Sequence, residues 1–271
     1  MVESQRRPLV AGLLGLFMMV SGSVSANDAM IRVYSAGSLK MPLQEAADAY
    51  GHGSGIRVAL TFGASGLLLE RIKKGEAADV FASANMDNPE TLFRDGLAGP
   101  VVRFARNRLC ALARPEIPAT TENLLSTLLD PKVRLGTSTP KSDPAGDYAW
   151  QMFHRAETVR PGSYATLDAK ALKLTGGTDS APAPEGRNAY GWLLESRQAD
   201  VFLTYCTNAL IAAKEVNGLS VIAIPPTLEV SGDYGVTVLA AGNREAANRF
   251  VAFILSVEGQ AILAKYGFSS P

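Results

Sequence analysis

Four short segments of the sequence place small and hydroxyl-bearing residues at the expected start of a helix. They are Ser35-Ala36-Gly37-Ser38-Leu39, Gly63-Ala64-Ser65-Gly66-Leu67, Ser142-Asp143-Pro144-Ala145-Gly146 and Tyr205-Cys206-Thr207-Asn208. The first N–H groups of a helix have no acceptor within the helix and lie at the positive end of its dipole. Small residues let an anion approach these groups, and hydroxyls add further donors. The segments together predict a binding site for a small anion.

Each segment also has a plain structural explanation. Serine is a favourable N-cap, glycine is common in tight turns, and Asp143-Pro144 is typical of a helix start. At that helix start the useful donors would be the backbone amides of Ala145 and Gly146. Binding is favoured because the segments recur at the carboxyl ends of expected strands, where open α/β sheets bind their ligands.

Enzymatic readings fit the same residues poorly. Gly63-Ala64-Ser65-Gly66 lacks the spacing of a nucleophile elbow, and the two histidines, His52 and His154, are not near a serine motif. The sequence has neither a P-loop nor G-x-G-x-x-G, and its cysteines and histidines are too few for a zinc cluster. We therefore expect no enzyme, no cofactor and no protein-bound metal cation.

Alternating β-rich and helical patterns predict α/β architecture with largely parallel sheets. The expected strands are residues 31–34, 56–62, 79–82, 108–113, 133–136, 200–204 and 234–239. The expected helices are residues 39–50, 67–74, 145–155, 165–174, 189–195, 208–215 and 244–265. The tetrapeptide Ala78-Asp79-Val80-Phe81 recurs at 199–202, each time at the start of a strand, which fits two lobes of similar build. We expect Asp79 and Asp200 to orient those strand starts rather than to act in catalysis.

The amino-terminal residues 1–26 match a cleaved secretory signal peptide. Arg6 and Arg7 precede a short apolar run, and Val24-Ser25-Ala26 supplies a small-x-small cleavage pattern. The run is short for a membrane anchor, which needs about 20 residues. The whole chain has 26 basic and 26 acidic residues, so removing Glu3, Arg6 and Arg7 leaves 24 and 25, a net charge of −1. This balance argues against nucleic-acid binding and requires any anion site to be local.

Cys110 and Cys206 are the only cysteines. In an oxidising compartment an even pair suggests one disulfide, whereas two buried free thiols are the alternative. Both cysteines fall on expected strands of the same half of the chain, which favours the bridge.

The sequence resembles the periplasmic molybdate-binding proteins of ABC importers over most of its length. The resemblance is carried by Ser35-Ala-Gly-Ser-Leu39, Phe62-Gly-Ala-Ser-Gly66, Lys74-Gly-Glu-Ala-Ala-Asp-Val-Phe-Ala-Ser-Ala84, Asp143-Pro-Ala-Gly-Asp-Tyr-Ala149, Gly259-Gln-Ala-Ile-Leu263 and Tyr266-Gly-Phe268. It implies a type II periplasmic binding fold, a clamshell of two α/β lobes with the anion in the cleft. The expected division is 27–106 and 233–271 for lobe I and 107–232 for lobe II.

The resemblance also implies which residues bind the oxyanion. Two serines of lobe I, an amide in a Pro-Ala-Gly turn, a further amide before a helix and a tyrosine hydroxyl carry over to Ser38, Ser65, Ala145, Gly186 or Arg187, and Tyr205. A fully deprotonated dianion such as molybdate or tungstate offers acceptors only, so neutral donors satisfy it. A protonated anion would be left with an unpaired group in such a cleft. The implied partner is a membrane permease, and we expect a monomer free in the periplasm.

One part of the predicted site departs from the family pattern. The loop at residues 175–184 is longer than usual, and the guanidinium of Arg187 could contact the anion or pair on the surface. With Arg187, the ligand could be sulfate or a small organic acid. A ferric-ion site would need paired tyrosines and an acidic ligand, and only Tyr205 lies at a junction. A secreted hydrolase would need a base that the sequence does not supply.

Overall fold

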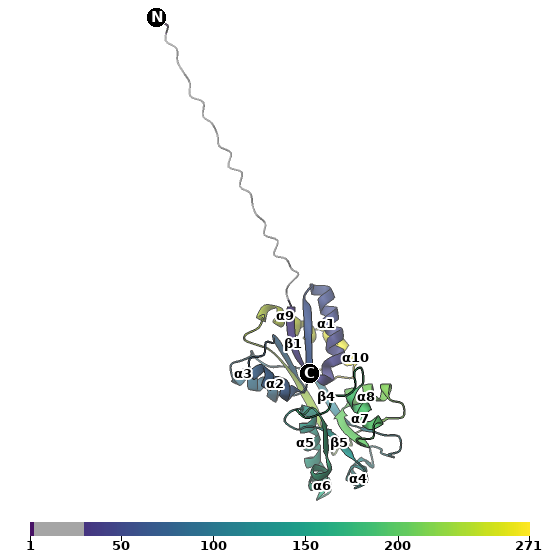
Figure 1. Ribbon diagram of the computed structural model, residues 1–271. Helices are drawn as coiled ribbons and strands as arrows, with labels where there is room; N and C mark the ends of the chain where they lie inside the picture. Colours follow the sequence, from purple (N-terminus) through teal and green to yellow (C-terminus); the bar gives the residue numbers. More distant parts are fainter. Residues whose placement is uncertain (3–29) are drawn as a thin grey trace.

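The computed structural model describes residues 1–2 and 30–271 (Figure 1). The expected signal peptide lies almost wholly outside these residues. The strands of the described part are β1 (Met30–Ala36), β2 (Arg57–Gly63), β3 (Val80–Ser83), β4 (Val102–Ala113), β5 (Leu135–Ser138), β6 (Leu172–Thr175), β7 (Val201–Tyr205), β8 (Ser220–Ala223) and β9 (Ser231–Val238). The helices are α1 (Lys40–Ser54), α2 (Ser65–Lys73), α3 (Asp87–Arg94), α4 (Leu124–Leu129), α5 (Pro144–Val159), α6 (Ser163–Lys170), α7 (Ala189–Glu195), α8 (Cys206–Glu215), α9 (Arg244–Leu255) and α10 (Val257–Lys265), with a 3₁₀ turn at Gly37–Leu39.

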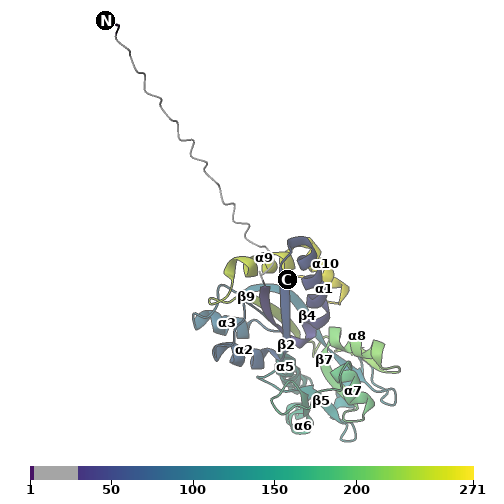
Figure 2. The ribbon, with the colours of Figure 1, turned by 45° about the horizontal axis from the view of Figure 1, so that its top comes forward.

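The molecule has two α/β lobes, as the sequence predicted (Figures 1 and 2). Lobe I contains the strand order β2-β1-β3-β9-β4 with helices α1, α2, α3, α9 and α10 around it. Lobe II contains the strand order β4-β7-β5-β6, and β8 pairs with β4 as well. Helices α4, α5, α6, α7 and α8 belong to this lobe. Each lobe mixes parallel pairs with antiparallel ones, because β9 and β4 run against their neighbours.

Strand β4 belongs to both sheets. Its first part, up to Arg108, pairs with β9, whereas the part from Leu109 to Ala113 pairs with β7 and β8. The lobe boundaries expected at 106/107 and 232/233 fall inside β4 and β9, the strands that connect the lobes, and stay a prediction.

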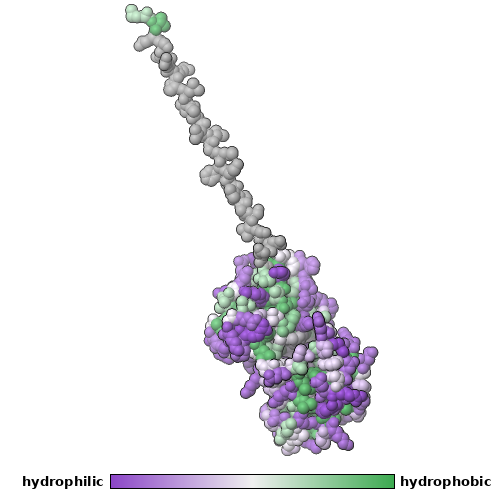
Figure 3. Space-filling model, viewed as in Figure 1, coloured by the Kyte–Doolittle hydropathy of each residue, from purple (hydrophilic) through white to green (hydrophobic). Residues whose placement is uncertain are grey.

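Each lobe has its own apolar core. In lobe I, Leu39 and Leu43 pack with Phe104 and Phe250, and all four are fully buried. In lobe II, Leu135, Met152, Phe153 and Leu203 pack together and are equally buried. On the face shown in Figure 3, hydrophilic and apolar residues are interspersed over both lobes.

The two Ala-Asp-Val-Phe segments carry out the same structural task in the two lobes. Asp79 accepts hydrogen bonds from the backbone N–H (2.7 Å) and Nε (3.1 Å) of Arg32, near the start of β1. Asp200 accepts the corresponding bonds from Arg134, both at 2.9 Å, next to the start of β5. The prediction that both aspartates orient strand starts is confirmed.

Two predicted helices were wrong in detail. The one expected at 165–174 ends at Lys170, and residues Leu172–Thr175 form β6 against β5. The one expected at 244–265 breaks at Ser256, whose Oγ accepts the N–H of Gly259 and so caps α10. The two resulting helices are bent by 62°, and only as this pair do they match a membrane span in length and composition. No single helix of the described chain does so.

Candidate ligand-binding site

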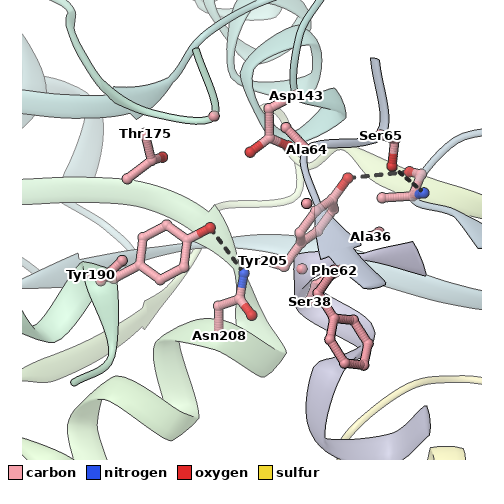
Figure 4. Close-up of a pocket in the computed structure, with 15 residues that line it drawn as sticks. Ala36, Ser38, Phe62, Ala64, Ser65, Asp143, Thr175, Tyr190, Tyr205 and Asn208 are labelled. Atoms are coloured by element: carbon pink, nitrogen blue, oxygen red, sulfur yellow. Dashed lines mark hydrogen bonds between the residues drawn. The ribbon is translucent and has the colours of Figure 1, made fainter. Parts of the chain in front are cut away.

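A cavity of about 230 Å³ lies between the lobes (Figure 4). Lobe I contributes the loops after β1, β2 and β3, and lobe II contributes the ends of β6 and β7 and the starts of α5, α7 and α8. The lining residues are Ala36, Gly37, Ser38, Phe62, Gly63, Ala64, Ser65, Ala84, Asp143, Thr175, Gly176, Ala189, Tyr190, Tyr205 and Asn208. Three of the six predicted contact residues, Ser38, Ser65 and Tyr205, therefore line the same cavity.

Ser38 belongs to the 3₁₀ turn that follows β1. Its Oγ lies 2.9 Å from the hydroxyl of Tyr234, which also accepts a hydrogen bond from the side-chain amide of Asn107 at 3.4 Å. Because Asn107 donates to Tyr234, the arrangement that uses every group has Tyr234 donating to Ser38. The hydroxyl hydrogen of Ser38 is then available to a ligand in the cavity.

Ser65 is the first residue of α2 and is almost fully buried. Its Oγ accepts the backbone N–H of Ala84 at 3.1 Å, which leaves its own hydrogen available to a ligand. Tyr205, at the end of β7, approaches from the other lobe, and its hydroxyl donates to the carbonyl of Ala84 at 3.2 Å. Ala84 thus positions one hydroxyl from each lobe. Burial raises the pKa of Tyr205 well above its usual value, so its hydroxyl keeps its proton.

Ala145 does not line the cavity, and its predicted donor is occupied. The N–H of Ala145 donates to Asp143 Oδ1 at 3.0 Å, because Asp143 is the N-cap of α5. The carboxylate of Asp143 itself lines the cavity, between Thr175 and Tyr205 in Figure 4. The expectation of a cleft with donors and no acceptors was therefore wrong. The sequence marked Asp143 as a helix cap but not as part of the cavity wall.

Gly186 and Arg187 lie outside the cavity in which the sequence placed them. They line a second, adjoining cavity of about 440 Å³, which shares Ser38, Tyr190 and Asn208 with the first. Arg187 Nε donates to Glu215 at 2.7 Å and its Nη2 to Glu195 at 2.5 Å. These two carboxylates raise the pKa of Arg187 and hold its guanidinium on the side of lobe II.

Tyr190 and Asn208 are cavity residues that the sequence did not single out individually. The side-chain amide of Asn208 donates to the hydroxyl of Tyr190 at 3.2 Å (Figure 4). Asn208 belongs to the fourth predicted junction, so its position could have been anticipated. Tyr190 could not, because it reaches the cavity only through the course of the loop before α7. Burial raises the pKa of Tyr190 to about 12.

The two cysteines form a disulfide next to the site. Cys110 on β4 is bonded to Cys206, the first residue of α8. Cys206 directly follows Tyr205, so the bridge fixes the end of the strand that carries the cavity tyrosine.

Comparison with known proteins identifies the family. Residues 31–269 match the model of the bacterial extracellular solute-binding proteins. A Pasteurella multocida protein of uncharacterized function is 36% identical over 88% of this chain and 98% of its own length. The molybdate-binding protein ModA of Escherichia coli is 26% identical over 92% and 93% of the two chains. The sulfate-binding protein SubI of Mycobacterium tuberculosis has the same fold, with a TM-score of 0.74, 18% identity and coverage of 89% and 87%.

These matches confirm the resemblance to ModA-like type II periplasmic binding proteins that the motifs predicted. They cover both lobes and the cavity between them. The chain belongs to the bacterial extracellular solute-binding proteins.

Proposed function

We propose that this protein captures molybdate or tungstate in the cleft between its lobes and delivers it to an ABC importer. The observation that supports this most is that three neutral hydroxyls, from Ser38, Ser65 and Tyr205, line one cavity. The hydroxyl of Tyr205 donates to the carbonyl of Ala84 at 3.2 Å, so we propose that its hydrogen turns from that carbonyl to the ligand on binding. The three hydroxyls come from both lobes, so a ligand that contacts all three favours the closed molecule. The ModA relative, which is named for molybdate binding, supports the choice of ligand.

The remaining parts of the proposal concern where and with what the protein works. We propose export by a signal peptide cleaved near Asn27, a periplasmic location, action as a monomer and a membrane permease as partner. The residues matched by the family model begin at 31, just after the proposed cleavage site. We propose no catalytic activity.

Isothermal titration calorimetry of the mature chain with sodium molybdate, tungstate and sulfate tests the ligand. We expect saturable one-to-one binding of the first two, and sulfate weaker by roughly tenfold or more because it is smaller. Saturable binding of sulfate without a response to molybdate would overturn the choice of ligand while leaving an oxyanion site.

A small organic anion is the second candidate, and the adjoining cavity favours it. That cavity continues from Ser38, Tyr190 and Asn208 toward Met41 and Ile211, which gives room for a carbon chain attached to an anionic head. Displacement of bound molybdate by short phosphorylated or carboxylated acids would support this candidate. Displacement by inorganic oxyanions alone would contradict it.

The cavity contains the residue types that a ferric-ion site would need, namely two tyrosines and an acidic residue. Tyr190, Tyr205 and Asp143 all line the cavity. However, iron binds the phenolate form, and burial raises the pKa of both tyrosines, which disfavours phenolates. We therefore favour an oxyanion.

A further inference from the structure

Asp143 places a carboxyl group in the wall of a cavity proposed to bind an anion. Its Oδ1 is held by the N–H of Ala145 at 3.0 Å. Its other side is held by Gly176, where an added Cβ would lie 2.5 Å from the Cβ and 2.6 Å from Oδ2 of Asp143. Gly176 also has a positive φ of 75°. The glycine therefore leaves just enough room for the carboxyl group, which is fixed in the wall rather than free to turn away.

The groups that face Asp143 do not neutralise it. Asp147 approaches from the same helix, Tyr190 from α7 and Tyr205 from β7, and none of these is a cation. Thr175 and Gly176, at the end of β6, and the lobe I residues of the cavity are uncharged. The ion pairs among the described residues include none to Asp143. Burial raises the pKa of Asp143, and the charge of Asp147 adds to this, whereas hydrogen bonds from the N–H of Ala145 and the hydroxyl of Ser138 oppose it.

A fully deprotonated oxyanion and an ionised carboxylate both offer only acceptors, so they repel one another when they share a small cavity. A single hydrogen between them removes the repulsion and creates a hydrogen bond. The protonated Asp143 would also replace the donor that is lost when the N–H of Ala145 is used for capping.

We propose that ligand binding in this cleft requires one proton, held between the carboxyl group of Asp143 and the ligand oxygen that faces it. This inference rests on the proposed oxyanion site. The proton has two possible sources. Molybdate and tungstate carry none near neutral pH, so Asp143 takes the proton from solvent. Hydrogen phosphate brings its own and donates it to an Asp143 carboxylate.

Titration calorimetry in two buffers of different ionisation enthalpy distinguishes these sources. Between about pH 6 and about pH 8.5, we expect wild-type protein to take up close to one proton per bound molybdate. Its Kd should then rise by up to about tenfold per pH unit. Hydrogen phosphate, if it binds, should do so with little uptake. The difference in proton uptake between molybdate and hydrogen phosphate therefore identifies the source of the proton.

Asp143→Asn is the matched variant, because asparagine is an equally good N-cap and cannot titrate. We expect it to bind molybdate without proton uptake, with a Kd that does not change with pH, and to bind hydrogen phosphate less well than wild type. Asp143→Ser, another capping residue, provides a second test if the asparagine variant does not fold. Asp147→Asn is the control. Asp147 accepts the N–H of Lys141 away from the cavity lining. Its variant should keep the proton uptake, although loss of the Asp147 charge should shift the pH range of that uptake downward.

The outcomes separate the two proposals. A wild-type protein that binds molybdate without proton uptake and with a constant Kd overturns the role of Asp143 alone. Equal proton uptake by wild type and by Asp143→Asn does the same, because another group then takes the proton. A folded wild-type protein that binds none of the oxyanions overturns the proposed function itself.

Discussion

The backbone N–H of Gly66, in the first turn of α2, donates a hydrogen bond of 2.8 Å to the carbonyl oxygen of Ser142. Gly66 belongs to lobe I and Ser142 to the loop before α5 in lobe II, so the bond joins the two sides of the cleft. An added Cβ at Gly66 would lie 2.2 Å from the carbonyl oxygen of Lys141. Lys141 itself has a positive φ of 68°, which is rare for a residue with a side chain. The closed arrangement thus depends on a glycine at position 66.

Gly66→Ala should therefore hold the lobes apart. The clash is with backbone, so it is relieved by separation of the lobes rather than by unfolding, and the melting temperature should change little. Ligand affinity should fall by roughly tenfold or more, because in an open cleft the ligand cannot contact both lobes at once. Small-angle scattering should show no compaction on addition of ligand. Gly53→Ala, where an added Cβ meets nothing within 4 Å, is the control and should behave as wild type.

Ser38→Ala removes a proposed ligand donor. Hydrogen bonds to a charged acceptor contribute roughly 1.5–3 kcal/mol, so the Kd for the oxyanion should rise by about 10- to 100-fold. Titration calorimetry measures the change. Ser163→Ala is a suitable control, since Ser163 is also buried but its hydroxyl has no partner in the described structure. Similar affinities for the two variants would remove Ser38 from the site.

Asp200 should make the stability of lobe II depend on acid pH. Arg134 lowers its pKa from the ordinary 3.8 to about 2. A carboxylate whose pKa is lowered in the folded state stabilises fully above its unfolded pKa, and this contribution is lost as the pH falls toward about 2. The shift corresponds to roughly 2 kcal/mol of unfolding free energy.

Urea unfolding at about pH 6 and about pH 3 checks this contribution. Asp200→Asn should be less stable than wild type at the higher pH, and the difference should shrink at the lower pH. Asp179→Asn, on an exposed loop, should differ little from wild type at either pH. A gap that stays constant between the two pH values would show that the effect is not electrostatic.

Reduction of the disulfide should destabilise the protein and loosen the cavity. The bridge closes a loop of 96 residues, for which chain entropy predicts a loss of roughly 4.7 kcal/mol of unfolding free energy on reduction. Dithiothreitol should lower the urea midpoint of wild type and weaken oxyanion binding, because Cys206 fixes the end of β7 beside Tyr205. The Cys110→Ala, Cys206→Ala double variant should be unaffected by the reductant. An equal effect of dithiothreitol on both proteins would contradict this explanation.

The sequence predicted the parts of the fold that depend on local patterns. The strand-to-helix junctions at Ser38 and Ser65 follow from small residues between an apolar strand and a helical pattern. Asp79 and Asp200 were placed by their repeated position before a strand. Local patterns were insufficient where a tertiary partner decides the structure, as for Leu172–Thr175, which continues a helical pattern but pairs with β5.

The cavity wall shows the same limit. Asp143 was correctly expected at a helix start, yet the direction of its carboxyl group depends on Gly176, more than thirty residues away in the chain. Arg187 was placed near the anion by its neighbours in the sequence, whereas its position is set by Glu195 and Glu215. Spacing alone does not predict such long-range pairings.

The sharing of strands between the lobes also constrains the order in which the chain can fold. In lobe I, β9 lies between β3 and β4, although it follows them by more than a hundred residues. A growing polypeptide therefore cannot complete its first sheet until residues 231–238 have been synthesised, and α9 and α10 must follow to cover it. The amino-terminal half thus lacks its native partners until most of the chain has been translated. A chain proposed to cross a membrane through a narrow channel benefits from that delay, because it stays unfolded, and so able to pass through the channel, until its last elements are available.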